Sequence, residues 1–443
     1  MPTNSARFET VSASPQTISS SPVIGPVRRQ DRIATIDILR GVAILGILIV
    51  NMTMRGFALP EGLPAHELWP NMIDRTVETL ILFFADQQFI TLFAFLMGLG
   101  LAAQMMRAEE REARFLPLYL RRLGVLWLIG MAHFLFLWDG DILHAYAQDG
   151  VYLLLFLRCS PKTLLVWAAI FLCIPLLLFG FTTRYAVTGH VNPYAMKWMQ
   201  YEGLAGDEDP AEDQQEIEEA RRIYSHGTYA EMIKLRASGL GELLPGSADA
   251  YIFVGFLLGL YVGKRGIFHD VSEHLPFIRR VQRWGLMIGG AGSVVFVMGE
   301  SNPSATAVMQ NVGRMCVVVA APAMSFFYAS TIILLTQDGD WRRRLAPVAA
   351  VGRMALSNYL FQSLICTMIF YSYGLALFCQ VRPSLCLLLT IIIWLIQIPL
   401  SVCWLRRFQF GPIEWLWRSL TYWKCQPMRV NRRKSAEGNG VRA

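Results

Sequence analysis

The sequence predicts an all-α integral membrane protein with about ten transmembrane helices and a helical loop domain on its outer side. Of the 443 residues, 54% are hydrophobic and only 16% are charged, whereas soluble domains usually carry about 25% charged residues. The charged residues gather between apolar runs, and most runs have the roughly 20 residues that one helix needs to cross a bilayer. Basic clusters occupy every second connection, which is the pattern of cytoplasmic loops.

Ten apolar runs account for the expected helices. They lie at about 33–54, 79–106, 118–138, 143–157, 163–183, 248–264, 284–300, 308–335, 347–376 and 383–405. The fourth and sixth runs are short, so we expect them to be tilted, partly re-entrant or extended by flanking residues. The runs define a membrane domain at 32–405. It lies between a disordered cytoplasmic tail at 1–31, rich in Ser, Pro, Thr and Gln, and a basic cytoplasmic tail at 406–443.

Lys and Arg residues in the short loops set the expected orientation. They lie before the first run, after the second, fourth, sixth and eighth runs, and after the tenth. Representative residues of these clusters are Arg29, Arg107, Arg122, Lys162, Arg265, Arg280, Arg343 and Arg407. An even number of spans places every cluster in the cytoplasm. We therefore expect a multi-pass protein with both termini in the cytoplasm.

The largest outer segment is expected at residues 184–247. Its stretch from Glu202 to Glu219 holds many acids and no Lys or Arg, and a more helical piece with Tyr224, Tyr229 and Met232 follows. This pattern predicts a small amphipathic cap on the outer face. Two roles stay open for the cap: a solvated loop with surface helices, or a lid over a substrate.

Charge and cysteine patterns exclude several kinds of site. The net charge is +7, but the basic residues lie beside apolar runs, where they act as topology signals and contact anionic lipids. We therefore expect the lipid bilayer, and no nucleic acid, as a partner. The eight cysteines show no paired spacing, no CxxC and no His/Cys cluster, so we expect neither a disulfide framework nor a metal site.

Two groups of charged residues lie near the predicted cytoplasmic boundary. An ionisable group inside a span is costly and is usually paired, directed into a cavity or functional. Asp37 and Arg40 are three residues apart and share a helix face. Either they neutralise each other while Arg40 reaches the headgroups, or Arg40 guides a phosphate-bearing ligand in from the cytoplasm. Arg353 lies at the same depth.

Two histidines and two acids gather near the outer end of the third run. His133, Asp139, Asp141 and His144 fall within a dozen residues. A carboxylate beside an imidazole fixes its tautomer and stabilises the imidazolium, which suits proton transfer near neutral pH. A membrane histidine also serves as a hydrogen-bond donor between helices, so both roles stay open.

Further polar residues lie in the other runs. We expect Arg314 to pair with Asp86 or Glu300 or to bind an anion. The amides of Asn358 and Gln362, four residues apart, either hold helices together or line a polar cavity. The predicted substrate-binding residues are Asp37, Arg40, Asn51, Asp86, Gln88, Arg314, Arg353, Asn358 and Gln362, and the predicted catalytic residues are His133, Asp141 and His144. Together they suggest an outward-facing polar site with a separate cationic entrance from the cytoplasm.

The same segments carry a resemblance to a known family. The pieces are DILRGVAILGILIVNM, FITLFAFLMGLG, RRLGVLWLIGMAHFLFLWDGDILHAYA, HGTYAEMIKLR, GRMALSNYLFQS and GPIEWLWRSLTYW. In these pieces, which are spread from the first span to the basic tail, the sequence resembles the YeiB-like family of bacterial inner-membrane proteins. The resemblance implies an inner-membrane location, and family members have often been labelled transporters.

The opening piece is also similar to that of membrane acyltransferases that modify sugars, including the heparan-glucosaminide acetyltransferase group. Those enzymes are thought to move an acyl group from cytoplasmic acyl-CoA to an acceptor on the far side, using a membrane-embedded histidine. Type-three acyltransferases place a histidine near the outer end of a similar first span, where this chain has Asn51. The resemblance therefore implies that His133 or His144 supplies the base.

Our leading hypothesis is a membrane O- or N-acyltransferase that uses an acyl-CoA-like donor as substrate and has no tightly bound cofactor. The donor would enter near Arg40 and Arg353. A histidine oriented by Asp139 or Asp141 would take a proton from a hydroxyl or amine of a small molecule or glycan.

In the same hypothesis Arg314 and Asn358 would bind the developing oxyanion or the acceptor. The alternative is a transporter or flippase for a small solute or lipid-linked molecule, which would use the same polar groups as a binding site and proton relay. A third possibility is that these groups only hold helices together.

Overall fold

The structure, a computed structural model, describes residues 34–53, 57–60, 65–112, 115–201, 210–242, 250–268, 270–302 and 304–430. Within these ranges the chain is helical, with one isolated β-bridge between Phe408 and Arg429. Seven helical segments are long and apolar enough to cross a membrane: α1 (Ala34–Thr53), the joined α3 (Met72–Phe84) and α4 (Gln88–Glu109), α5 (Phe115–Phe136), α7 (Pro161–Thr188), α12 (Leu275–Glu300), α13 (Ala307–Leu335) and α17 (Pro383–Arg407). The all-α membrane class predicted from the sequence is confirmed.

The other three predicted runs form shorter elements. These are α6 (Leu143–Tyr152) with the 3₁₀ turn η2 (Leu153–Phe156), α11 (Ala250–Lys264), and the pair α15 (Ala346–Arg353) and α16 (Ala355–Phe370). The 15 residues of α11 rise about 22 Å, which is less than the roughly 30 Å of hydrocarbon in a bilayer. The ninth run is interrupted at Met354. Three of the ten predicted runs therefore form helices that are shorter than a typical transmembrane helix.

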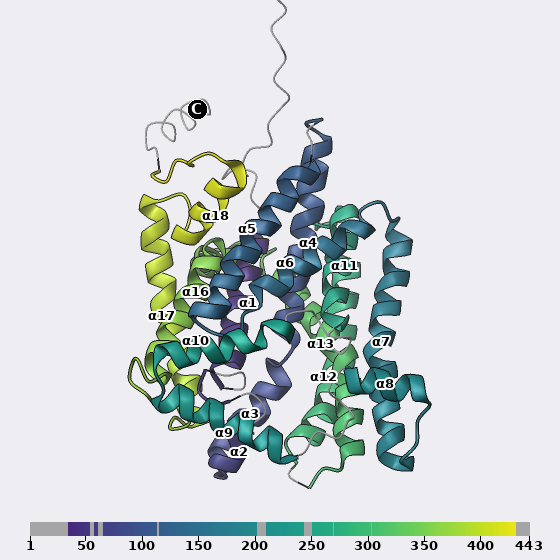
Figure 1. The fold of residues 1–443 in the computed structure, drawn as a ribbon. Coiled ribbons are helices and arrows are strands. Elements are labelled where there is room, and N and C mark those ends of the chain that lie inside the picture. The colour runs from purple at the N-terminus through teal and green to yellow at the C-terminus, as the bar shows by residue number, and fades with distance from the viewer. Residues whose placement is uncertain are drawn as a thin grey trace, which may run out of the picture.

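The first and last transmembrane helices leave the bundle at the same end. Ala34 at the start of α1 and Arg406 at the close of α17 line one groove, so the chain crosses the bundle an even number of times between them. Figure 1 shows α18 (Pro412–Tyr422) at this end, and α2 (Ala65–Leu68) and α9 (Pro210–His226) at the opposite end. We call the end with Arg406 and α18 the basic end.

The opposite end carries a helical cap, as expected from residues 184–247. It contains α8 (Pro193–Tyr201), α9, α10 (Tyr229–Ser238) and η3 (Gly239–Glu242), while 202–209 and 243–249 lie outside the described residues. Tyr224 and Met232 are buried in the same core as Phe57 and Trp138. The end of α9 and α10 therefore pack into the bundle, whereas most of residues 214–222 of α9 are exposed.

Residues after α17 differ from the predicted tail. Gly411 and Pro412 begin α18, which packs on α5 and α16, and the Trp415 indole donates to the Gln426 carbonyl at 2.8 Å. The chain thus folds back against the bundle as far as Val430, because α18 presents an apolar face to it. The predicted tail 1–31 and the rest of the C-terminal tail, 431–443, lie outside the described residues.

Close packing of α1 against α15 positions the charged residues of the basic end. A Cβ atom added at Gly41 would lie 2.3 Å from the Val348 carbonyl oxygen, and one at Gly352 would lie 1.8 Å from that of Asp37. Only glycine allows the two backbones to approach this closely. The contact brings Asp37 on α1 beside Arg353 on α15.

The second predicted span is broken between α3 and α4. Gln87 adopts a left-handed conformation with φ 66°, so α3 ends at Phe84 and α4 begins at Gln88. Neighbouring helices satisfy the exposed polar groups: Tyr328 donates to the Phe84 carbonyl at 2.7 Å, and Tyr251 donates to the Gln87 side chain at 2.7 Å. A break at this depth is tolerated because protein groups replace the missing helical hydrogen bonds.

Candidate functional site

Asp141 joins the two predicted histidines. His133 lies in the last turn of α5, His144 lies in the first turn of α6, and Asp141 lies in the connection between them. Nδ1 of His133 is 2.7 Å from Oδ1 of Asp141, and Nδ1 of His144 is 3.0 Å from Oδ2. All three side chains are buried. The structure therefore brings the predicted catalytic residues together.

The local backbone explains this geometry. The His144 amide donates to Oδ2 of Asp141 at 2.9 Å, so the aspartate also accepts an otherwise unpaired N–H of the first turn of α6. Gly130 lets α5 approach, because a Cβ atom there would lie 2.5 Å from the His144 nitrogen and 2.8 Å from Oδ2 of Asp141. Asp139 points elsewhere and accepts a hydrogen bond from Tyr224 of the cap at 2.5 Å.

The free edge of His133 has the properties of a base. A carboxylate that accepts from Nδ1–H leaves the lone pair on Nε2. The Nε2 atom of His133 is buried and has no hydrogen-bond partner among the residues that the structure describes. Buried polar atoms are rarely left in this state without a reason. The arrangement can therefore accept a proton from a group bound beside His133, while Asp141 stabilises the resulting imidazolium.

A cavity of about 370 Å³ leads from the basic end toward this cluster. We call it the central pocket. Its walls come from α1, α4, α5, α6, α15, α16 and α18. Six arginines line it, Arg40, Arg107, Arg111, Arg122, Arg353 and Arg418, together with three acids, Asp37, Glu110 and Glu414. Its deeper wall is apolar and includes Ile44, Ile47, Phe93, Met97 and Leu126.

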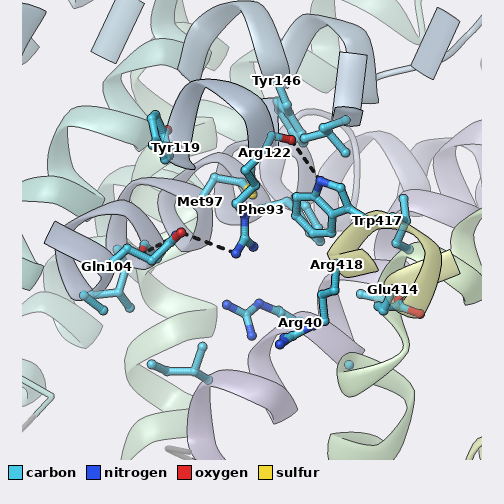
Figure 2. Close-up of a pocket in the computed structure, with 18 of the residues that line it drawn as sticks. Arg40, Phe93, Met97, Gln104, Tyr119, Arg122, Tyr146, Glu414, Trp417 and Arg418 are labelled. Atoms are coloured by element: carbon cyan, nitrogen blue, oxygen red, sulfur yellow. Dashed lines mark hydrogen bonds between the residues drawn. The ribbon is translucent and has the colours of Figure 1, made fainter. Parts of the chain in front are cut away.

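Arginines concentrate at the mouth of the central pocket. Figure 2 shows Arg40 and Arg122 directed into the same opening, with Arg418 beside them. Arg122 lies over the Trp417 ring at 4.2 Å and donates to Gln104 at 3.3 Å, while the Trp417 indole donates to the Arg122 carbonyl at 2.9 Å. Guanidinium groups held in this way suit phosphate oxygens.

Two of the acids in the central pocket are engaged by other groups. Asp37 forms an ion pair with Arg40 at 3.2 Å. Glu414 accepts hydrogen bonds from the amide and the hydroxyl of Ser357, with the amide at 3.0 Å. Burial raises the pKa of the Glu414 carboxyl, and the Ser357 hydrogen bonds oppose this effect. The arginines therefore dominate the electrostatics of the mouth.

Tyr359 connects the central pocket with the histidines. Its side chain lines the inner end of the pocket beside Leu143 and Tyr146. The centroid of its ring lies 5.2 Å from that of His133. A ligand that enters at the basic end and reaches Tyr359 would therefore be separated from His133 only by the Tyr359 ring.

The predicted substrate-binding residues are divided between the central pocket and other parts of the bundle. Arg314 pairs with Glu300 at 3.1 Å, as one of the predicted alternatives had it. Asp86 and Gln88 flank the break between α3 and α4, and Asn51 is buried in α1. Arg40, Asp37 and Arg353 do line the central pocket.

The predicted amides of α16 bond to α17. The Asn358 side chain donates to the Val351 carbonyl and the Ser401 hydroxyl, each at 3.1 Å, and the Asn358 backbone carbonyl accepts from the Gln397 side chain at 3.1 Å. Gln362 donates to Gln397 at 2.8 Å. Because these groups satisfy one another, they hold the two helices together and do not line the central pocket.

Sequence reasoning did not select Tyr359, Trp417 or Arg418, and it used Arg122 only as a sign of topology. The available signal was the piece GPIEWLWRSLTYW, in which an arginine and two tryptophans share one amphipathic helix. Among the described residues, no group of three or more His, Cys, Asp or Glu side chains is arranged to hold a metal ion.

Comparison with known proteins adds a family context. The family model described as protein of unknown function (DUF418) matches residues 262–424, which include Arg353, Tyr359, Trp417 and Arg418 but not the histidine pair. The uncharacterized protein YxaH of Bacillus subtilis (strain 168) is 34% identical over 423 residues, covering 91% of this chain and 97% of the relative.

Two further relatives match over similar lengths. The uncharacterized protein YeiB of Escherichia coli (strain K12) is 30% identical over 418 residues, covering 88% of this chain and 96% of the relative. An uncharacterized 39.9 kDa protein encoded in the amylase 3' region of Bacillus acidopullulyticus is 27% identical, covering 92% and 99% respectively. The similarity therefore extends over both the histidine pair and the central pocket.

Proposed function

This chain belongs to the YeiB-like family of membrane proteins, and we propose that it is a membrane-bound acyltransferase. In this proposal it lies in the bacterial inner membrane with the basic end in the cytoplasm. It moves an acyl group from a cytoplasmic acyl-CoA-like donor to a hydroxyl or amine on the other side. The observation that supports this proposal most directly is a pocket that begins among arginines and ends at Tyr359, beside the His133–Asp141 pair.

The two halves of the central pocket match the two halves of such a donor. The phosphates of a coenzyme A-like molecule carry negative charge, which Arg40, Arg122 and Arg418 would bind at the mouth. The thioester arm is much less polar and would lie along the wall near Phe93 and Met97. This orientation brings the thioester carbonyl toward Tyr359.

The reaction needs one general base and one hydrogen-bond donor that stabilises the negative charge developing on the carbonyl oxygen. Nε2 of His133 takes a proton from the acceptor, whose oxygen or nitrogen attacks the thioester carbonyl. The C–S bond then breaks, and the imidazolium returns the proton to the departing thiolate. Asp141 stabilises the imidazolium between the two transfers. The Tyr359 hydroxyl would donate to the carbonyl oxygen in the role that the sequence suggested for Arg314 and Asn358.

The experiment is a transfer assay with purified full-length protein in lipid nanodiscs, radiolabelled acyl-CoA and a panel of glycans, alcohols and amines. We expect product with the wild-type protein and a drop of about 10²–10⁴-fold for His133→Ala, the usual value of a general base. His190→Ala, at an exposed histidine in the connection after α7, is the matched control and should behave as wild type.

Binding of coenzyme A by calorimetry separates the two parts of the proposal, because it needs no acceptor. Arg122→Ala should weaken this binding, and His133→Ala should leave it nearly unchanged. Absence of coenzyme A binding, or full transfer by His133→Ala, would refute the proposed function.

A transporter or flippase is the second candidate, and the break between α3 and α4 is the observation that favours it. Discontinuous helices often form solute sites in transporters, and Asp86 is buried at this break. Solute flux into proteoliposomes that is lost in Asp86→Asn, without acyl transfer by the wild type, would favour this candidate.

A further inference from the structure

A second groove lies at the basic end, outside the central pocket. Its volume is about 680 Å³, and it runs between α1, α14 (Gly339–Arg344), α15 and α17. Three arginines line it, and each comes from a different helix: Arg343 from α14, Arg353 from α15 and Arg406 from α17. We call it the lateral groove. Three arginines that border one groove from separate helices provide the donors that suit an anion with several oxygens.

The charges that face the lateral groove are unbalanced. The only acid among its lining residues in the described part of the chain is Asp37, and Oδ1 of Asp37 already pairs with Arg40 at 3.2 Å. Arg343 and Arg406 are exposed, so an incoming ligand can reach them. The arginines that line the groove therefore outnumber its acid by three to one, so an anionic ligand would meet a net positive charge.

The rest of the lateral groove is apolar, which argues for a ligand with an apolar portion. Its wall includes Pro347, Val402 and Leu405. Leu395, Val402 and Arg406 are spaced by seven and four residues and share one face of α17, and Leu395 is 58% exposed. This face leads from the groove toward the middle of a helix long enough to cross the membrane. Cationic groups therefore lie at the end of a helix whose outer face is apolar.

We propose that the lateral groove binds an anionic phospholipid, with its phosphate between Arg343, Arg353 and Arg406 and its acyl chains along the exposed face of α17. Basic pockets between transmembrane helices at the cytoplasmic surface suit such headgroups. A zwitterionic lipid carries a cation beside its phosphate, which the same arginines repel. The proposal depends on the membrane class of the protein and is independent of acyl transfer.

The test measures lipid binding to purified full-length protein by native mass spectrometry. The probes are phosphatidylglycerol, phosphatidylcholine and inorganic phosphate. We expect the wild type to bind phosphatidylglycerol more tightly than phosphatidylcholine. The double variant Arg343→Gln/Arg406→Gln should bind phosphatidylglycerol about tenfold to thirtyfold more weakly, since each cation near a membrane surface contributes a factor of roughly five and the variant loses two cations.

The matched control is Arg279→Gln/Arg283→Gln. These arginines line a different groove beside Leu334. They lie at the same end of the bundle, because Thr336 just after α13 contacts Thr35 of α1 at 3.0 Å. The control loses the same charge and should keep wild-type affinity. Arg343→Lys/Arg406→Lys should recover most of the binding lost in the glutamine variant, which separates loss of charge from misfolding.

Three results would overturn the proposal. The first is equal affinity of the wild type for the two lipids. The second is an equal loss in the control variant, which would mean that general surface charge is responsible. The third is displacement of phosphatidylglycerol by inorganic phosphate at comparable concentration, which would identify a free anion as the ligand.

Discussion

Asp141 occupies the position on which the histidine cluster depends. One carboxylate accepts from the Nδ1 atoms of two imidazoles and from the His144 amide. Each of its oxygens is therefore engaged, and both rings are held with Nδ1 toward the acid. This leaves Nε2 as the edge available for a substrate. The two histidines thus act as one unit whose geometry is set by a single side chain.

We expect Asp141→Asn to reduce acyl transfer by about 10²–10⁴-fold, because the amide neither stabilises an imidazolium nor accepts from both rings. Asp139→Asn is the matched control, since Asp139 lies two residues away and bonds Tyr224 instead of a histidine. The transfer rate of each variant is compared at equal folded fraction. Similar losses in both variants would contradict the assignment of Asp141 as the positioning acid.

At this scale the sequence predicted contacts that are close along the chain. Asp141 is eight residues from His133 and three from His144, so their proximity followed from one helix end and one short connection. Arg122 and Trp417 are 295 residues apart, and local spacing carries no information on such a pair. For Arg314 the sequence left two acids open as partners, and packing selected Glu300.

The contact between α1 and α15 determines the shape of both pockets at the basic end. Asp37 and Arg353 line the central pocket as well as the lateral groove. They can do so because Gly41 and Gly352 bring the two backbones into contact. The glycines therefore shape both pockets through the spacing of the two helices.

We expect Gly41→Ala to destabilise the protein by about 1–3 kcal/mol, the usual cost of overpacking, because its Cβ atom would lie 2.3 Å from the Val348 carbonyl oxygen. Gly290→Ala on α12 is the control, since no atom lies within 4 Å of the added Cβ atom. Thermal melting in detergent measures both. An unchanged melting temperature for Gly41→Ala would show that α1 and α15 separate easily.

Element boundaries were predicted less well than the elements themselves. The lengths of the apolar runs located the helices. The polar residues Asp86, Gln87 and Gln88, however, are compatible with a continuous helix as well as with a broken one. The break depends on Tyr251 and Tyr328, which come from other helices. Likewise, the partners of the amide pair on α16, Gln397 and Ser401, lie on α17.

At the scale of the whole molecule, α1 and α17 meet at one end while the cap lies at the other. The prediction of an even number of spans agrees with this placement, although three of the ten runs are short. The docked α18 was missed, because basic composition after the last span is also typical of a tail. The apolar face of α18 has a surface to pack against only once α5 and α16 are folded.

The orientation of the molecule can be tested with cysteine labelling. Cys425, just after α18, is exposed and serves as the reporter of the basic end in a background that lacks the other cysteines. Glu218→Cys on α9 reports the cap, since the Glu218 side chain is 72% exposed. In sealed right-side-out vesicles, an impermeant maleimide should label the thiol introduced on α9 and should reach Cys425 only after lysis. The reverse pattern would contradict a cytoplasmic basic end.

The central pocket joins the first transmembrane helix to the last described helix, since Arg40 lies on α1 and Trp417 on α18. A ribosome adds the segment with Trp417 after all the other helices that line the central pocket. The helices that bear the histidines therefore enter the membrane before the arginine mouth has its last wall. A nascent chain that ends before α18 would hold the histidine pair but not Trp417 and Arg418, so the central pocket is completed only after α18 has been synthesised.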